Sequence, residues 1–91
     1  MNISNTVYEN IVQEFYDNGK DHRNYKYLFQ GLVEEAKEVE NCNTENDLIY
    51  ELGDVLWYVT MIARTKGWTL NDIMHKNIIK LEDRVLNGKN T

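Results

Sequence analysis

Four carboxylates stand in two short motifs of the chain, and the two acids of each motif are three residues apart. Glu35 and Glu38 lie in the stretch LVEEAKEVE, and Glu51 and Asp54 lie in YELGDVLWYV, with twelve residues between the pairs. Residues three apart are neighbours on one face of a helix. If the two helices pack together, two carboxylates ~5 Å apart repel by about 3 kcal/mol at an effective dielectric of ~20. Such a cluster needs protons or cations to neutralise it.

The chemistry that these four acids support is the binding of a divalent cation. Carboxylate oxygens without histidine or cysteine favour Mg²⁺, and Mn²⁺ can substitute for it. Helix bundles build such sites from acids on facing helices. Two alternatives stay open. The acids of the first motif can be part of a solvated helix face, and those of the second can be capped by local hydrogen bonds or paired with Arg64 or Lys80.

A cationic stripe follows near the end of the sequence. Asn77, Lys80 and Arg84 are spaced i, i+3 and i+7, so they line one border of a helix. Beside an acidic metal site, lysine and arginine suit phosphate oxygens, because Mg²⁺ is commonly shared between carboxylates and substrate phosphates. Alternatively, the two cations only complement the dipole at a helix C-terminus.

The elements that carry these motifs are predicted to be helices in a single domain of residues 1–91. The chain has no proline and only five glycines, which favours long helices with short connections. Apolar residues recur at helical spacing in four segments, at about residues 5–16, 27–40, 45–66 and 70–86. A polar loop is expected at residues 17–26, and the expected N-caps are Thr44 and either Thr69 or Asn71. The predicted fold is all-α, a four-helix bundle.

The periodicity also predicts which side chains are buried. In the first segment, Val7, Ile11 and Phe15 recur every four residues, and in the second, Gly31 is expected to leave open space beside the acids. The fourth segment is expected to pack five apolar residues inward: Leu70, Met74, Ile78, Leu81 and Val85. The third is apolar nearly all round, because a second face opposes its main one, with Tyr50, Trp57 and Met61. A four-helix monomer cannot easily cover that face, so we expect a homo-oligomer.

Charge and cysteine content exclude some classes of partner. The formal net charge is −5, which argues against nucleic acid or an anionic membrane as the main partner. The longest apolar run, VLWYV, is far shorter than the ~20 residues that cross a bilayer. The single cysteine, Cys42, cannot form an intramolecular disulfide, and the polar start MNISNTVYEN is no signal peptide. We therefore expect a cytoplasmic protein.

The paired motifs and the basic segment together resemble the MazG-type nucleotide pyrophosphohydrolases, a family of all-α proteins. The family motif is E-E-x-x-E, a spacer and E-x-x-D, and this chain has EEAKE at residues 34–38 and ELGD at residues 51–54. The stretch VLWYVTMIARTKGWTLNDI is similar to the family's helix, turn and helix, and KNIIKLEDR resembles its C-terminal segment. The resemblance covers about residues 28–84.

The resemblance implies hydrolysis of a nucleoside triphosphate, expected to be a deoxynucleotide, to the monophosphate and pyrophosphate, in nucleotide-pool control or house-cleaning. It implies that Mg²⁺ is held by four acids that are also the catalytic residues: Glu35, Glu38, Glu51 and Asp54. It ranks Glu34 lower, as a residue that orients water or lies outside the direct metal ligands.

The same resemblance extends to the substrate and to assembly. It places three residues near the phosphates, Asn77, Lys80 and Arg84. It places Tyr58 near the nucleoside, although Tyr58 suits the core equally well. Family members assemble as homodimers or as tetramers made from dimers, with composite sites.

Two other classes of protein compete with this interpretation. The stretch TKGWTLNDIMHKNIIKLEDR also reads as a helix-turn-helix with a basic recognition helix, which would bind DNA. The chain has 15 acidic and 10 basic residues, a balance that opposes DNA binding. A non-catalytic helical protein-interaction module is the other alternative, and it leaves the acidic cluster unexplained.

Overall fold

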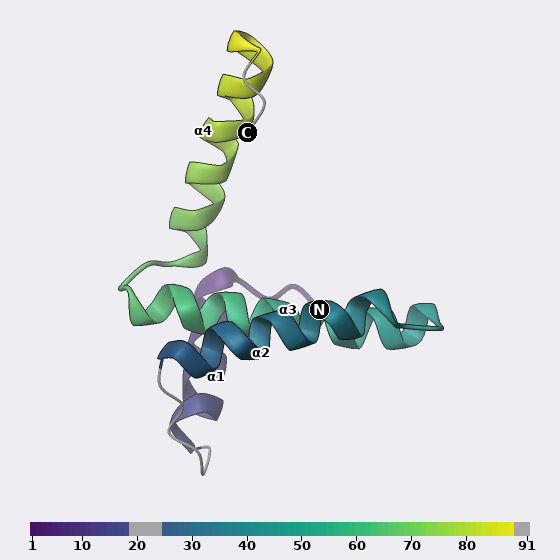
Figure 1. Cartoon of the computed structure of the whole chain (residues 1–91). Coiled ribbons are helices and arrows are strands. Elements are labelled where there is room, and N and C mark those ends of the chain that lie inside the picture. Colours follow the sequence, from purple (N-terminus) through teal and green to yellow (C-terminus); the bar gives the residue numbers. More distant parts are fainter. Residues whose placement is uncertain (19–24, 89–91) are drawn as a thin grey trace.

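The computed structural model describes residues 1–18 and 25–88, and within them it contains helices and no strands (Figure 1). The four helices are α1 (Asn5–Asn18), α2 (Tyr25–Glu40), α3 (Glu45–Thr65) and α4 (Leu70–Asn87). The all-α prediction is confirmed. Residues 19–24 of the expected loop lie outside the described residues, and the flanking helices extend further toward it than expected. Among the described residues, no helix is both long and apolar enough to span a membrane.

Local sequence determines where α3 begins and ends. Thr44 is its N-cap, and the Thr44 side chain accepts a hydrogen bond from the Asp47 backbone N–H at 3.1 Å. Glu45 and Asp47 place negative charge in the first turn, where the helix dipole favours it. Gly67 follows the helix with a φ of 76°, and the next amide, of Trp68, donates to Ala63 O at 3.0 Å.

The start of α4 settles the choice between two candidate caps in favour of Thr69. The Asp72 N–H donates to the Thr69 hydroxyl at 3.1 Å, and the Thr69 N–H donates to Asp72 Oδ2 at 2.9 Å. This reciprocal pair is a capping box, which satisfies two backbone donors. The helix ends at Gly88, whose φ of 66° is the left-handed conformation that glycine adopts at little cost.

Helices α2 and α3 form an antiparallel pair, and most contacts between helices belong to this pair. The pair is joined by the short segment of residues 41–44. Helix α1 crosses the pair, and α4 leads away from it at the end of α3 (Figure 1). Helix α4 contacts α1 and α3, but not α2, within the described chain.

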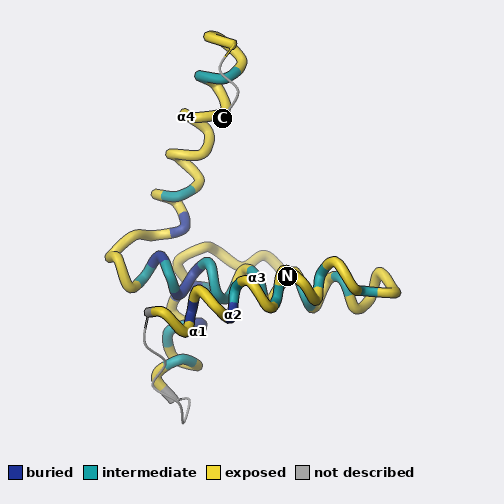
Figure 2. The backbone as a smooth tube through the Cα atoms, in the orientation of Figure 1, coloured by how far each residue is buried: buried dark blue, intermediate teal, exposed yellow. Residues whose placement is uncertain are grey.

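The core is small and lies where α1 crosses the pair (Figure 2). It consists of Val12, Leu28 and Met61, one residue from each of α1, α2 and α3. Trp57 packs against this core and its ring centroid lies 6.2 Å from that of Tyr16 on α1. Of the predicted second face of α3, Met61 is buried in this core and Trp57 is half-buried against α1, whereas Tyr50 stays exposed at 69%.

Helix α1 buries a different line of apolar residues from the one that recurs every four residues in its sequence. Val12 is buried and two tyrosines, Tyr8 and Tyr16, pack against the core. The other line stays exposed in this chain, with Val7, Ile11 and Phe15 at 50%, 43% and 71%. Period alone identifies both lines as apolar and does not say which one meets α2 and α3.

The largest difference from expectation is α4. Leu70 is buried, but the four other residues expected to point inward are exposed, with Met74, Ile78, Leu81 and Val85 between 43% and 83%. The reason is geometric, since only the start of α4 reaches the other helices. The four helices therefore do not close into one bundle. The radius of gyration is 15.2 Å, against about 12 Å for a compact domain of this length.

Gly31 is buried because a tyrosine ring takes the place of its side chain. A Cβ built on Gly31 would lie 2.5 Å from Tyr58 Cζ and 2.8 Å from the Tyr58 hydroxyl oxygen. The expected open space is thus filled by Tyr58 of α3. This close approach lets α2 and α3 pack tightly one turn before Glu35.

We predict opposite effects from adding a methyl group at two helical glycines. Gly31→Ala forces the Tyr58 ring to move, whereas a Cβ on Gly53 meets no atom within 4 Å. Helix propensity favours alanine at both positions, and overpacking penalises Gly31→Ala alone, so this variant should be less stable than Gly53→Ala by about 1–3 kcal/mol. Urea unfolding of both proteins measures the difference. Equal stability of the two variants would contradict the packing of Tyr58 on Gly31.

Candidate functional site

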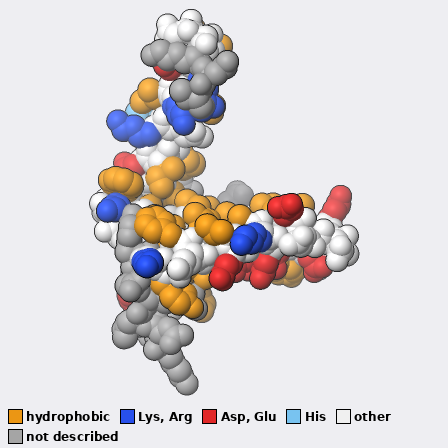
Figure 3. Space-filling model, in the orientation of Figure 1, with side chains coloured by type: hydrophobic (Ala, Val, Ile, Leu, Met, Phe, Trp, Pro, Cys, Tyr) orange, Lys and Arg blue, Asp and Glu red, His pale blue; other side chains and the backbone are white. Residues whose placement is uncertain are grey.

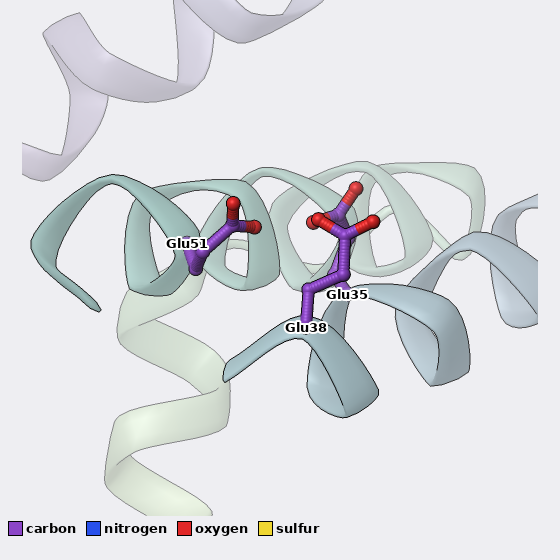
Figure 4. Close-up of side chains that lie close together, drawn as sticks. All are labelled: Glu35, Glu38 and Glu51. Carbon is purple, nitrogen blue, oxygen red and sulfur yellow. The ribbon is translucent and has the colours of Figure 1, made fainter. Parts of the chain in front are cut away.

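Three of the four predicted acids meet between α2 and α3. Glu35 and Glu38 extend from α2, and Glu51 extends from α3 toward them (Figure 4). One carboxylate oxygen of each residue lies within 4.8 Å of one from each of the others. The spacing of three within α2 and the antiparallel packing of α3 together produce this group, which we call the acidic cluster.

Two oxygens of the acidic cluster are buried without a hydrogen-bond partner. These atoms are Glu35 Oε2 and Glu51 Oε2. Buried polar atoms are nearly always hydrogen-bonded, and an unsatisfied one costs free energy. Because carboxylates are acceptors only, three of them cannot satisfy one another without a proton or a cation between them.

The mutual repulsion of the three carboxylates favours neutralisation of their charge by protons or by a cation. Burial raises the pKa of Glu35 and of Glu51, and a hydrogen bond with Glu51 is the main cause of the raised pKa of Glu38. The charge of Asp54 raises the pKa of all three further. Since these carboxyls hold protons more tightly when folded, the cation-free protein loses stability as pH rises through their pKa values. A cation reverses that penalty.

Asp54 and Glu34 lie at the edges of the cluster. Asp54 is exposed, one turn after Glu51, and its oxygens are outside the group within 4.8 Å. Glu34 is exposed and borders a separate hollow with Phe29 and Lys37. Its charge still raises the pKa of the neighbouring Glu35 and Glu38.

A cleft of about 280 Å³ opens beside the cluster. Glu38 and Glu51 form one side, and the remaining lining comes from the α2–α3 connection and the start of α3: Asn41, Cys42, Asn43 and Asp47. None of these four residues is predicted from the sequence as part of the site. Only the spacing of four between Asp47 and Glu51 could have indicated that both share a helix face.

Two tyrosines border the same region. Tyr58 is half-buried over Gly31, and its ring meets Trp57 edge-on at a centroid distance of 5.0 Å. Tyr8 of α1 was not predicted as a site residue. It packs against the core, and burial and then the charge of Asp54 raise its pKa.

The cationic stripe is not brought to the acidic cluster of its own chain. Asn77 and Lys80 are exposed and Arg84 is half-buried on α4, which does not contact α2. Figure 3 shows a row of acidic side chains on the α2–α3 arm, with some basic ones beside it, and both basic and acidic side chains on α4. Arg64, one of the cations considered as a partner for the acids, donates from Nε to Gln13 Oε1 at 2.7 Å.

The residues of the cluster fit a hard divalent cation. All donors are carboxylate oxygens, two of the buried oxygens lack a partner, and the group contains no histidine or cysteine. This donor set suits Mg²⁺ or Mn²⁺. Glu35, Glu38 and Glu51 are the residues that could hold it, with Asp54 one turn away.

Comparison with known proteins identifies the class to which this helical site belongs. The profile of the MazG nucleotide pyrophosphohydrolase domain matches residues 23–87. The chain therefore belongs to the MazG family. The gene 37 protein of Mycobacterium phage L5 is 36% identical over an alignment of 72 positions, and the match covers 64% of this chain and 63% of that protein. The match thus spans less than two thirds of the phage protein. No solved structure matches the chain.

We predict that divalent cations stabilise the folded protein. A free cation concentration ten times the Kd adds about 1.4 kcal/mol, or roughly 6–11 °C in Tm for a domain of this size. Glu51→Gln should abolish this response and raise the Tm without cation, because it removes like-charge repulsion. Glu40→Gln, on the exposed end of α2, should keep the response. A Tm that does not change in millimolar Mg²⁺ or Mn²⁺, with or without nucleotide, would reject the site.

Proposed function

We propose that the protein hydrolyses nucleoside triphosphates in a Mg²⁺-dependent reaction, at the bond between the α and β phosphates, to a monophosphate and pyrophosphate. Deoxynucleotides are the proposed substrates, in nucleotide-pool control or house-cleaning. The observation that carries the proposal is the acidic cluster with two unpartnered buried oxygens, in a domain of the MazG family.

In this proposal, the acids of α2 and α3 bind the cation, and one of them accepts the proton of the attacking water. A bound Mg²⁺ supplies charge neutralisation at the phosphates and a more acidic water. Glu35 and Glu51 are the more buried ligands, and Glu38 is exposed. We assign to Glu38 the acceptance of the proton from the attacking water, because its side chain is exposed to solvent beside the two more buried acids. Asp54 completes the ligand set, and Glu34 orients water from outside it.

The cationic stripe has a separate role, which is to hold the β and γ phosphates through Lys80 and Arg84, with Asn77 beside them. Their charge favours the departing pyrophosphate as negative charge grows on it. Tyr58 contacts the sugar or base at the other end of the substrate.

A second copy of the chain is proposed to bring the stripe to the acids, in a homodimer or a tetramer made from dimers. The stripe of one chain does not reach its own cluster, since α4 does not contact α2. Apolar side chains are exposed on α3 as well as α4, with Ile49, Leu52 and Leu56 at 68%, 49% and 43%. Exposed apolar surface of this extent marks an interface.

The reaction itself is tested with a panel of nucleotides and oxygen-18 water. We expect the label in the monophosphate, because water attacks the α phosphorus. Glu35→Gln, Glu38→Gln and Glu51→Gln should each lower kcat by at least about 100-fold for every nucleotide. Lys80→Ala should instead weaken triphosphate binding more than monophosphate binding. Label in pyrophosphate, or release of orthophosphate, would reject the proposed bond cleavage.

Mixing Glu51→Gln chains with Arg84→Ala chains, at a triphosphate concentration too low for Arg84→Ala alone to turn over, tests whether sites are shared between chains. In a dimer with shared sites, Glu51→Gln and Arg84→Ala chains together build one intact site per mixed dimer. Random association of equal amounts should restore about a quarter of wild-type activity. Mixing two Glu51→Gln preparations is the control and should restore none. If the first mixture also stays inactive while mixed dimers form, each site is built within one chain.

A further inference from the structure

Helix α1 makes two hydrogen bonds to the corner where α3 turns into α4. Glu9 Oε2 accepts from the Leu70 backbone N–H at 3.3 Å, and Gln13 Oε1 accepts from Arg64 Nε at 2.7 Å. Glu9 and Gln13 are four residues apart, so they lie on one face of α1. The two bonds therefore connect α1 to the end of α3 and to the start of α4. Neither Glu9 nor Gln13 falls within the residues that match the family profile.

The Glu9 contact satisfies a backbone group that the helix itself leaves free. The first amides of any α-helix have no intrahelical acceptor. Thr69 provides an acceptor for Asp72, and Glu9 provides one for Leu70. Glu9 is only 5% exposed, so its carboxylate is buried against the positive end of α4.

Among the described residues, the packing of α4 on the rest of the chain is confined to its start. Leu70, in the first turn, is its single buried residue among those described. Helix α4 contacts only α1 and α3. The preceding turn passes through Gly67, whose added Cβ would meet no atom within 4 Å, so nothing packs on the turn at that point.

The length of α4 makes its direction important for the cationic stripe. Lys80 and Arg84 lie ten and fourteen residues after Leu70, which is ~15 Å and ~21 Å along the helix axis. A rotation of about 10° at the corner moves Arg84 by roughly 4 Å. A misplacement of ~1 Å in a substrate-holding group can cost about 100-fold in rate.

We propose that Glu9 and Gln13 are positioning residues that hold α4 at a fixed angle to α1 and α3, and so hold the cationic stripe where triphosphate binds. The proposal that α1 fixes this angle rests on the contacts described above. Its consequence for the substrate rests on the proposed function.

The angle is measured as a distance between two spin labels in the full chain. Labels go on Asn46→Cys in α3 and Glu82→Cys in α4, both exposed, in a Cys42→Ser background. Labelled protein is diluted with unlabelled protein, so that only distances within one chain are recorded. We expect one narrow distribution in the parent protein and a broader or shifted one after Glu9→Ala. Glu9→Gln, which keeps an acceptor oxygen, should restore most of the narrow distribution.

Two further variants keep the test decisive. Gln13→Ala removes the half-buried bond to Arg64 and leaves the buried contact of Glu9 with the first turn of α4, so it should broaden the distribution less than Glu9→Ala. It carries the test if Glu9→Ala does not fold. Asn10→Ala, at an exposed residue of the same helix, is the control and should leave the distribution unchanged. Distributions in Glu9→Ala and Gln13→Ala that match the parent would overturn the proposal.

Steady-state kinetics of the Glu9 variants distinguish failure of this proposal from failure of the proposed function. Glu9→Ala should raise KM for a triphosphate by about tenfold or more, with a smaller change in kcat, and Glu9→Gln should recover most of the loss. If the parent protein hydrolyses no nucleotide, the proposed function fails, and the label distances still decide whether α1 fixes α4. If KM and kcat are unchanged while the distance distribution broadens, α4 is held by α1 but its angle does not serve the substrate, and the positioning role is rejected.

Discussion

Like-charge repulsion between α2 and α3 is the constraint around which this small protein is built. Glu35, Glu38 and Glu51 meet at the one helix pair with extensive contacts, and two of their oxygens are buried without a partner. The pair is held together against this repulsion by Leu28 and Met61 in the core and by the Tyr58 ring on Gly31. The acidic cluster therefore lowers the stability of the folded chain, as functional sites commonly do. A cation would relieve the same repulsion, and carboxylate oxygens are the ligands that suit Mg²⁺ or Mn²⁺.

The second constraint is a shortage of apolar contacts within one chain. The described core joins three helices and leaves α4 attached only by its first turn. A chain of this size buries a limited fraction of its surface, and association with a second copy is an efficient way to bury more. In this protein the cationic stripe lies on the same helix that most lacks partners. Assembly and completion of the proposed substrate site therefore depend on the same element.

Sequence predicts those features of this fold that depend on neighbouring residues. The cap at Thr44, the ends at Gly67 and Gly88, and the shared helix face of Glu35 and Glu38 are local features that the sequence indicates, and the cap of α4 was narrowed to Thr69 or Asn71. Which apolar face meets which neighbour is not local. Helical period marks several lines of apolar residues, and it could not show that α1 covers Trp57 or that α4 points away. Gly31 illustrates the same limit, because the ring that fills its space comes from a residue 27 positions later.

The short connection between α2 and α3 has a consequence for the order of events in folding. Their contacts join residues close in sequence, so closing this hairpin costs little loop entropy compared with docking α1 or α4. The acidic cluster belongs wholly to that hairpin, and its three carboxylates therefore come together early. Interactions that already exist in the transition state change the folding rate more than the unfolding rate. Divalent cations are accordingly expected to increase the folding rate of this chain, because they reduce the repulsion between the carboxylates of α2 and α3 as the two helices come together.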